Sequence, residues 1–190
     1  MTSPRTSASF PSGASVAAAG IRGIVFGDMR DHRLVALDRT SRELSEGRSD
    51  VSYRFRHYVK HENCNPWSEA YENTLSCYVA KMMEAAADTQ GDEAFWKFYD
   101  WVLANQSTLD SGRAVNIAAH QLGFVPVDLL ERAGSAEVRD RISAEGFVLE
   151  SMGKRGGPWV FINERAVTGR FEVASPSLLA KIFAAAAAGK

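Results

Sequence analysis

Cysteine is scarce in this 190-residue sequence, which holds only Cys64 and Cys77. If the chain from Pro66 onward forms one helix, Cys77 lies about 16 Å along it at a rise of ~1.5 Å per residue. That separation exceeds the Cα–Cα distance of under about 7 Å that a disulfide needs. Unless the helix starts late, we therefore expect two separate thiols rather than a disulfide.

The sequence also lacks an excess of charge of either sign and lacks long apolar runs. Lys and Arg total 22 against 23 Asp and Glu, which gives a formal net charge of -1. This balance provides no overall basic field that would recruit nucleic acid or an anionic membrane. No apolar run approaches the roughly 20 residues of a membrane span. We therefore expect no nucleic-acid partner and no membrane span in this chain.

The first 20 residues contain almost nothing to bury, because Ser, Ala, Pro, Thr and Gly dominate them. Such a composition is typical of a flexible linker. The one apolar part, Val16–Ala19, is shorter than the h-region of about 7 to 15 residues in a signal peptide. We expect a linker over residues 1–20, no signal peptide, and a folded domain over residues 21–190. A linker of this kind is compatible with a domain of a larger protein.

The remaining chain opens with a strand, a helix and a second strand. Ile21–Gly27 is a short apolar run, and Val51–Val59 alternates with the period of a half-buried strand. Between them, His32–Glu46 carries its apolar residues on one broad helical face, and Asp31 is placed to cap this helix. A βαβ unit of this size predicts two parallel strands.

A helical block, a hairpin and a last helix follow. Periodicity predicts helices over residues 66–89, 93–105, 111–121, 127–132 and 137–152, and the aromatic residues near 95–101 are expected to be core. Pro158 then heads the apolar strand Trp159–Ile162, Asn163 and Glu164 form a turn, and Arg165–Thr168 returns as a second strand. Ser175 and Pro176 begin the last helix. This order favours an α/β sheet covered by helices.

The same order resembles the thioredoxin fold with the helical insertion of the DsbA family of thiol-disulfide oxidoreductases. The segments that carry the resemblance are IVFGD at 24–28, YRFRHYV at 53–59, AAADTQGDEAFWKFYDWVLANQ at 85–106 and GPWVFINERAVTG at 157–169. The resemblance implies a thioredoxin-like α/β fold, ordered βαβ, helical insertion, ββα, with the insertion at about 62–135. It also suggests a cell-envelope or exported location, while a cytoplasmic one stays open.

The sequence departs from that family where the family carries Cys-x-x-Cys, after the first strand and at the start of the helix. This chain has Asp31, His32, Arg33 and Leu34 there. Dithiol exchange needs a thiolate and a resolving thiol, so these residues cannot support the family's usual reaction at this position. Before the proline, the family often has threonine where this chain has Gly157. Backbone pairing with an extended client could persist there while side-chain contacts are lost.

Two hypotheses for function follow from this departure. The first, which we favour, is a non-catalytic module without a cofactor that holds a peptide or a partner protein. Its groove would lie between Asp31–Leu34 and Gly157, Pro158 and Trp159, with Arg33 as an anchor for a carboxylate. The second is an enzyme, either a thiol oxidoreductase that uses Cys64 alone or a glutathione-dependent transferase or isomerase. Against both stands a simpler interpretation, in which Asp31 only caps a helix and Pro158 only shapes the fold.

Cys64 and its neighbours leave further alternatives. Cys64 precedes Pro66 at an expected helix start, where the helix macrodipole would lower a thiol pKa, but an inert free cysteine is the commoner case. Cys77 is expected to be a small buried apolar residue. His57, His61 and Cys64 have a spacing that a zinc site could use. Because no fourth ligand is evident, we expect no metal site.

Overall fold

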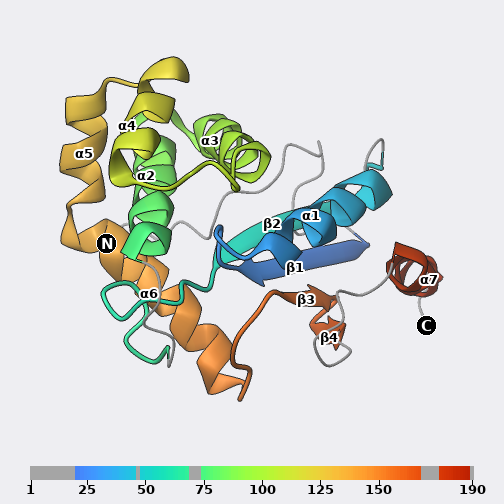
Figure 1. The fold of residues 1–190 in the computed structure, drawn as a ribbon. Helices are drawn as coiled ribbons and strands as arrows, with labels where there is room; N and C mark the ends of the chain where they lie inside the picture. The colour runs from blue at the N-terminus through green and yellow to red at the C-terminus, as the bar shows by residue number, and fades with distance from the viewer. Residues whose placement is uncertain (1–19, 46–47, 69–73, 168–175, 189–190) are drawn as a thin grey trace.

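The computed structural model describes residues 20–45, 48–68, 74–167 and 176–188. Within these residues the elements follow the order β1 (Ile21–Gly27), α1 (His32–Ser45), β2 (Val51–His57), α2 (Thr74–Gln90), α3 (Asp92–Ala104), α4 (Gly112–Gln121), α5 (Pro126–Ala133), α6 (Ala136–Ser151), β3 (Trp159–Ile162), β4 (Arg165–Val167) and α7 (Pro176–Ala187) (Figure 1). None of the helices in these ranges has both the length and the hydropathy that crossing a bilayer requires.

The strands form one mixed sheet in the order β2-β1-β3-β4. β1 pairs with β2 in parallel, which confirms the prediction from the βαβ pattern. β3 pairs antiparallel with β1 and with β4. The predicted turn is confirmed, and Asn163 and Glu164 both adopt positive φ, 48° and 70°, as a tight two-residue hairpin turn requires. Thr168 and Ser175, expected in the second hairpin strand and before the last helix, lie outside the described residues.

One face of this sheet carries the main core. Alternate residues of β1 and β2, among them Val25 and Phe55, are fully buried there and join one apolar cluster with Leu37 of α1 and Leu179 of α7. Both helices are amphipathic, so each turns an apolar stripe toward the sheet. The result is a sheet sealed by α1 and α7, with the end of β1 and the start of α1 meeting at one edge.

The helical block stands to one side of the sheet, between β2 and β3 in the chain (Figure 1). Its aromatic helix α3 buries Phe95, Phe98 and Tyr99, so the prediction that these aromatics are core is confirmed. Phe55 of β2 packs against the rings of Phe95 and Tyr99, at centroid distances of 6.4 and 4.9 Å. The block therefore shares its core with the sheet.

The second face of the sheet is covered in part by α6. Phe26 of β1 and Phe161 of β3 pack edge to face at 5.7 Å, and Leu149 of α6 is fully buried against them. Tyr58, just past β2, belongs to the same cluster. This contact brings the C-terminal end of α6, and the coil that follows it, next to the edge where α1 begins.

The two cysteines form a disulfide, with a Cα–Cα distance of 5.6 Å. The prediction of two separate thiols is therefore wrong. It assumed a helix running from Pro66, whereas α2 begins at Thr74, which leaves Cys77 in the first turn of α2. Cys77 is therefore only three positions from the start of α2. The turn at residues 61–64 places Cys64 beside it. The disulfide fastens the segment after β2 to the first inserted helix.

Candidate functional site

The site predicted from the sequence lies at the N-terminus of α1, beside Pro158. Asp31 caps this helix, because its carboxylate oxygen Oδ1 accepts the backbone N–H of Arg33 at 3.0 Å and its carbonyl accepts that of Leu34 at 2.9 Å. The predicted N-cap role of Asp31 is thus confirmed. The Asp31 side chain is almost entirely buried, so its charge needs partners.

Two cations supply them. The Arg33 Nε lies 2.9 Å from Asp31 Oδ1, and the Lys60 Nζ lies 3.0 Å from Oδ2. Burial alone would raise the pKa of Asp31, but the hydrogen bonds from Arg33 and Lys60 outweigh it and lower that pKa to about 2. Asp31 is therefore an anion at any physiological pH, and it holds two half-buried cations side by side.

Arg33 also ties α1 to the loop before β3. Its Nη2 donates to the carbonyl oxygen of Gly157, and the peptide bond from Gly157 to Pro158 is cis. The sequence leaves backbone pairing between Gly157 and an extended client possible. In the structure the Gly157 carbonyl already accepts a hydrogen bond from the guanidinium of Arg33.

Asp28 fixes the loop between β1 and α1. Its carboxylate accepts hydrogen bonds from the Arg30 N–H at 2.8 Å, the Ser76 hydroxyl at 2.8 Å and the Lys60 N–H at 2.9 Å. The Gln106 side-chain amide donates to the carbonyl of Met29 in the same loop at 2.6 Å. Contacts from the segment after β2, from α2 and from the end of α3 thus set the position of Asp31 and Arg33.

The other predicted site residues divide into surface and core. His32, the first residue of α1, is exposed. Leu34 is fully buried, and a Cβ placed on Gly27 would lie 2.8 Å from its Cδ1. The prediction that Leu34 lines a groove is therefore wrong. Helical geometry explains this: Leu34 shares a face with the core residues Leu37 and Ser41, three and seven positions on.

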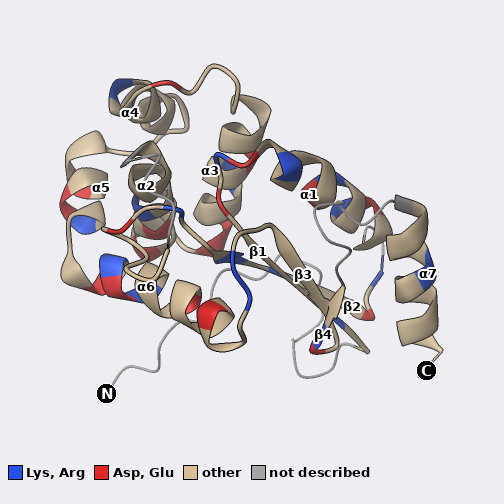
Figure 2. Cartoon of the chain, turned by 60° about the horizontal axis from the view of Figure 1, so that its bottom comes forward, with Lys and Arg blue, Asp and Glu red and all other residues tan. Residues whose placement is uncertain are grey.

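Trp159 forms the opposite side of the site with a basic coil. Its ring is half-buried, its Nε1 donates to the carbonyl of Arg155 at 3.3 Å, and the Lys154 Nζ lies 4.7 Å from the ring centroid. Figure 2 shows a blue, basic stretch in the coil that joins α6 to β3, where the sequence has Lys154 and Arg155. The surface beside Pro158 therefore has Arg33 and Lys60 on one side. On the other side it has Lys154 and Arg155, and the Arg155 Nε is paired with Glu150 Oε2 at 3.2 Å.

A buried ionic cluster of His57, Glu84 and Glu145 joins β2 to α2 and α6, and its role does not follow from the sequence pattern. The His57 Nε2 lies 3.1 Å from Glu84 Oε1, and Glu145 Oε2 accepts the His57 N–H at 2.7 Å. Burial alone would lower the pKa of His57, but the hydrogen bond and the charge of Glu84 raise it. Burial is also the main reason why the pKa of Glu145 rises to about 7. No spacing in the sequence could indicate that His57 of β2 contacts Glu84 of α2 and Glu145 of α6.

Cys64 does not present a thiol at this site. It is fully buried and bonded to Cys77, so the prediction of Cys64 as a free thiol is wrong. The spacing that a zinc site could use joins His57, His61 and Cys64. His57 instead pairs with Glu84, and the His61 Nδ1 accepts the backbone N–H of Asn63 at 3.2 Å.

Comparison with known proteins supports the fold. No protein-family model and no curated protein matches the sequence. Among solved structures, the thiol-disulfide exchange protein alpha-DsbA2 from Wolbachia pipientis has a TM-score of 0.69 at 14% identity, covering 88% of this chain and 82% of its own. BdbD from Bacillus subtilis has a TM-score of 0.70 at 13% identity, covering 90% and 94%. Pseudomonas aeruginosa DsbA2 has 0.64 at 18%, covering 87% of each.

These likenesses extend over most of this chain and most of each solved structure. The chain therefore has a thioredoxin-like fold of the kind found in DsbA proteins, as the order of its elements predicted. At such low identity the likeness concerns the fold, and the chemistry must be argued from this chain's own residues.

Proposed function

We propose that this chain is a thioredoxin-fold binding module that holds a carboxylate-bearing, extended segment of a protein partner beside Pro158, without dithiol chemistry at that position. One observation carries the proposal. At the helix N-terminus where the DsbA family carries its dithiol, this chain has the ion-paired cluster of Asp31, Arg33 and Lys60, and cysteine is absent from residues 28–34.

The cluster keeps donors free for a ligand. A guanidinium has five N–H groups and an ammonium has three. Arg33 uses Nε and Nη2 on Asp31 and Gly157, and Lys60 uses one N–H on Asp31. Among the residues that the structure describes, that leaves Arg33 Nη1 and two Lys60 N–H groups to receive a carboxylate. A ligand can therefore bind without breaking the bridge from Arg33 to Gly157.

The cluster is also preorganised. Arg33 Nη2 and Lys60 Nζ both bind Oδ2 of Asp31, so the two side chains are ordered before a ligand arrives, and less conformational entropy is lost on binding. The three charges sum to +1, and α1 adds the positive end of its dipole. Lys154, Arg155 and the half-buried ring of Trp159 extend the surface along the chain, which suits an acidic segment with an apolar side chain.

Selection from a displayed peptide library on the immobilised, oxidised protein tests this proposal. We expect binders enriched in Asp and Glu, with micromolar affinity that weakens with salt. Arg33→Gln and Lys60→Gln should each weaken binding about three- to tenfold, on the scale of one exposed charge contact. Lys181→Gln, which changes an exposed lysine on α7, is the matched control and should bind as the parent does.

Two results would refute the proposal. One is a selected set without acidic enrichment. The other is a set of acidic binders whose affinity is unchanged by Arg33→Gln and by Lys60→Gln.

A further inference from the structure

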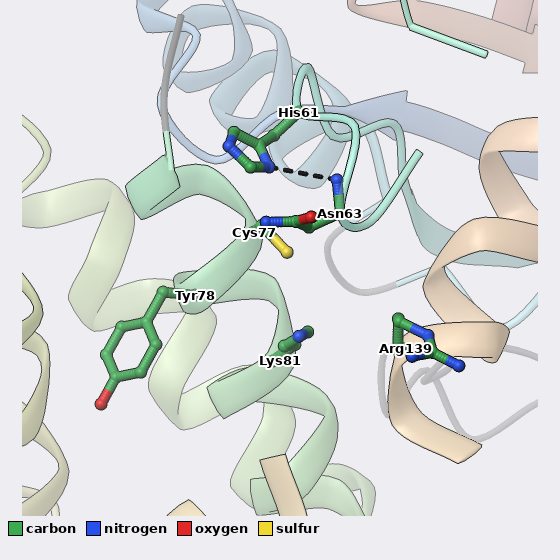
Figure 3. Close-up of a pocket in the computed structure, with 6 residues that line it drawn as sticks. All are labelled: His61, Asn63, Cys77, Tyr78, Lys81 and Arg139. Carbon is green, nitrogen blue, oxygen red and sulfur yellow. Dashed lines mark hydrogen bonds between the residues drawn. The ribbon is translucent and has the colours of Figure 1, made fainter. Parts of the chain in front are cut away.

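A pocket of about 330 Å³ opens next to the disulfide, apart from the site beside Pro158. Its size is at the lower end of the ~300–1,000 Å³ range of small-molecule sites. The residues that line it are His61, Asn63, Cys77, Tyr78, Lys81 and Arg139. Figure 3 shows them arranged around the space between the segment after β2, the first turns of α2 and the start of α6.

The pocket is cationic and supplies few acidic groups of its own. Within the part of the chain that the structure describes, none of its lining residues is Asp or Glu. Lys81 has no carboxylate partner among the described residues. Arg139 pairs with its neighbour Asp140 at 2.9 Å, but both side chains are more than half exposed, so this ion pair is weak and can exchange for a ligand carboxylate.

The pocket reaches one sulfur of the disulfide and not the other. Cys64 has no exposed surface, whereas Cys77 is 5% exposed and forms part of the pocket wall. The Tyr78 ring points away from the other lining residues, and its hydroxyl donates a hydrogen bond to Asn116 at 2.6 Å. A small molecule in the pocket therefore meets a disulfide sulfur on one side and cations on the other.

We propose that this pocket binds a small thiol that carries carboxylates, of the glutathione class, and directs it to the sulfur of Cys77. Lys81 and Arg139 would hold the carboxylates. The pocket shares no lining residue with the site beside Pro158, so this proposal does not depend on the peptide-binding function.

The reaction that this arrangement allows is thiol-disulfide exchange. The ligand thiolate attacks the Cys77 sulfur, the Cys64–Cys77 bond breaks, and Cys64 leaves as a thiolate that takes up a proton. The product is a mixed disulfide on Cys77. A second ligand thiolate then attacks the ligand sulfur of that mixed disulfide, which leaves two protein thiols and one oxidised ligand. Two electrons pass from two ligand thiols to the protein disulfide.

The test compares two thiols that differ in charge. The oxidised protein is treated with glutathione or with cysteamine, which carries an ammonium group and no carboxylate, and disulfide opening is followed by alkylation and mass spectrometry. Each rate is divided by the rate for the same thiol with the chain unfolded in urea, which removes differences in intrinsic thiol reactivity. We expect this ratio to be about tenfold larger for glutathione, because the folded pocket concentrates its carboxylates.

Variants assign the effect to the pocket. Lys81→Gln and Arg139→Gln should each reduce the glutathione ratio about fivefold, while the cysteamine ratio does not fall. Lys181→Gln on α7 is the matched control and should leave both ratios unchanged. The proposal would be overturned by equal ratios for the two thiols in the parent protein. It would also be overturned by a glutathione ratio that is unchanged in Lys81→Gln and Arg139→Gln.

A second experiment identifies the sulfur. In Cys64→Ala, the remaining Cys77 thiolate should attack oxidised glutathione and become glutathionylated in the folded protein, releasing one glutathione. A folded Cys64→Ala protein that resists this modification would contradict the proposal. If that variant does not fold, the rates measured on the parent protein still decide. Neither failure bears on peptide binding beside Pro158.

Discussion

Glu145→Gln should stabilise this protein at alkaline pH and leave its stability nearly unchanged at acidic pH. Glu145 is buried in α6, where its carboxylate accepts the backbone N–H of His57. Burial first, and the nearby charge of Glu84, raise its pKa from 4.5 to about 7, although the charge of His57 opposes them. The glutamine amide oxygen can accept the same N–H without bringing a charge into the core.

The sign follows from where the proton is bound. Because the pKa of Glu145 is higher in the folded protein than in the unfolded chain, the folded state keeps a proton that the unfolded chain has already lost. The stabilisation is complete below about pH 4.5 and is lost as the pH rises to about 7. At ~1.4 kcal/mol per pKa unit, the loss amounts to about 3 kcal/mol. Glu145→Gln removes this loss.

Urea denaturation at pH 5 and pH 8 measures the effect. We expect free energies of unfolding that agree within about 1 kcal/mol at pH 5, and a Glu145→Gln protein that is more stable by about 2–3 kcal/mol at pH 8. Glu131→Gln, which changes an exposed glutamate on α5, controls for the loss of one negative charge. A difference between Glu145→Gln and the parent that is the same at both pH values would refute this account of the buried carboxylate.

Three further predictions concern the disulfide, the site and a helix contact. Reduction of the disulfide between Cys64 and Cys77, which are 13 positions apart, should cost about 3 kcal/mol and lower the midpoint of thermal unfolding by about 6–12 °C, measured by circular dichroism with and without reductant. Because the pKa of Asp31 is lowered to about 2, its contribution of about 2 kcal/mol is present above pH 4 and lost as the pH falls toward 2, and acid titration of Asp31→Asn should lack this loss. Gly146→Ala should destabilise the fold by about 1–3 kcal/mol in urea denaturation, since its Cβ would lie 2.9 Å from the buried Asn65 side chain. A stability unchanged by reduction, an acid titration of Asp31→Asn like that of the parent, or a neutral Gly146→Ala would each contradict its prediction.

The fold could be predicted because its signals are local. The alternation in β2, the apolar stripe of α1 and the turn at Asn163 and Glu164 each depend on residues a few positions apart. Those patterns placed the helices and strands within a few residues of where they lie. The one large error concerned α2, where the apolar spacing continues before Thr74, so the periodicity could not show where the helix begins.

The site could be predicted only in part, because its decisive contacts join distant segments. Asp31 as a cap and Arg33 as a nearby cation follow from adjacent residues. Lys60, in the segment after β2, binds Asp31. Arg33 donates a hydrogen bond to the carbonyl of Gly157, which lies 124 positions further along the chain. Neither pairing leaves a periodic signal in a single sequence. The disulfide was missed for the same reason, since it depends on the path of the chain between Cys64 and α2.

The most direct test of the central claim is an NMR titration of the uniformly ¹⁵N-labelled, oxidised protein with an acidic peptide obtained by the selection described above. We expect the largest shifts on the Arg33 Nε–H, the Gly157 amide and the Trp159 Nε1–H, and none of these shifts with a basic peptide of equal and opposite net charge. Binding at the proposed site would be contradicted if these three signals did not shift while others did, such as those around the pocket at Cys77.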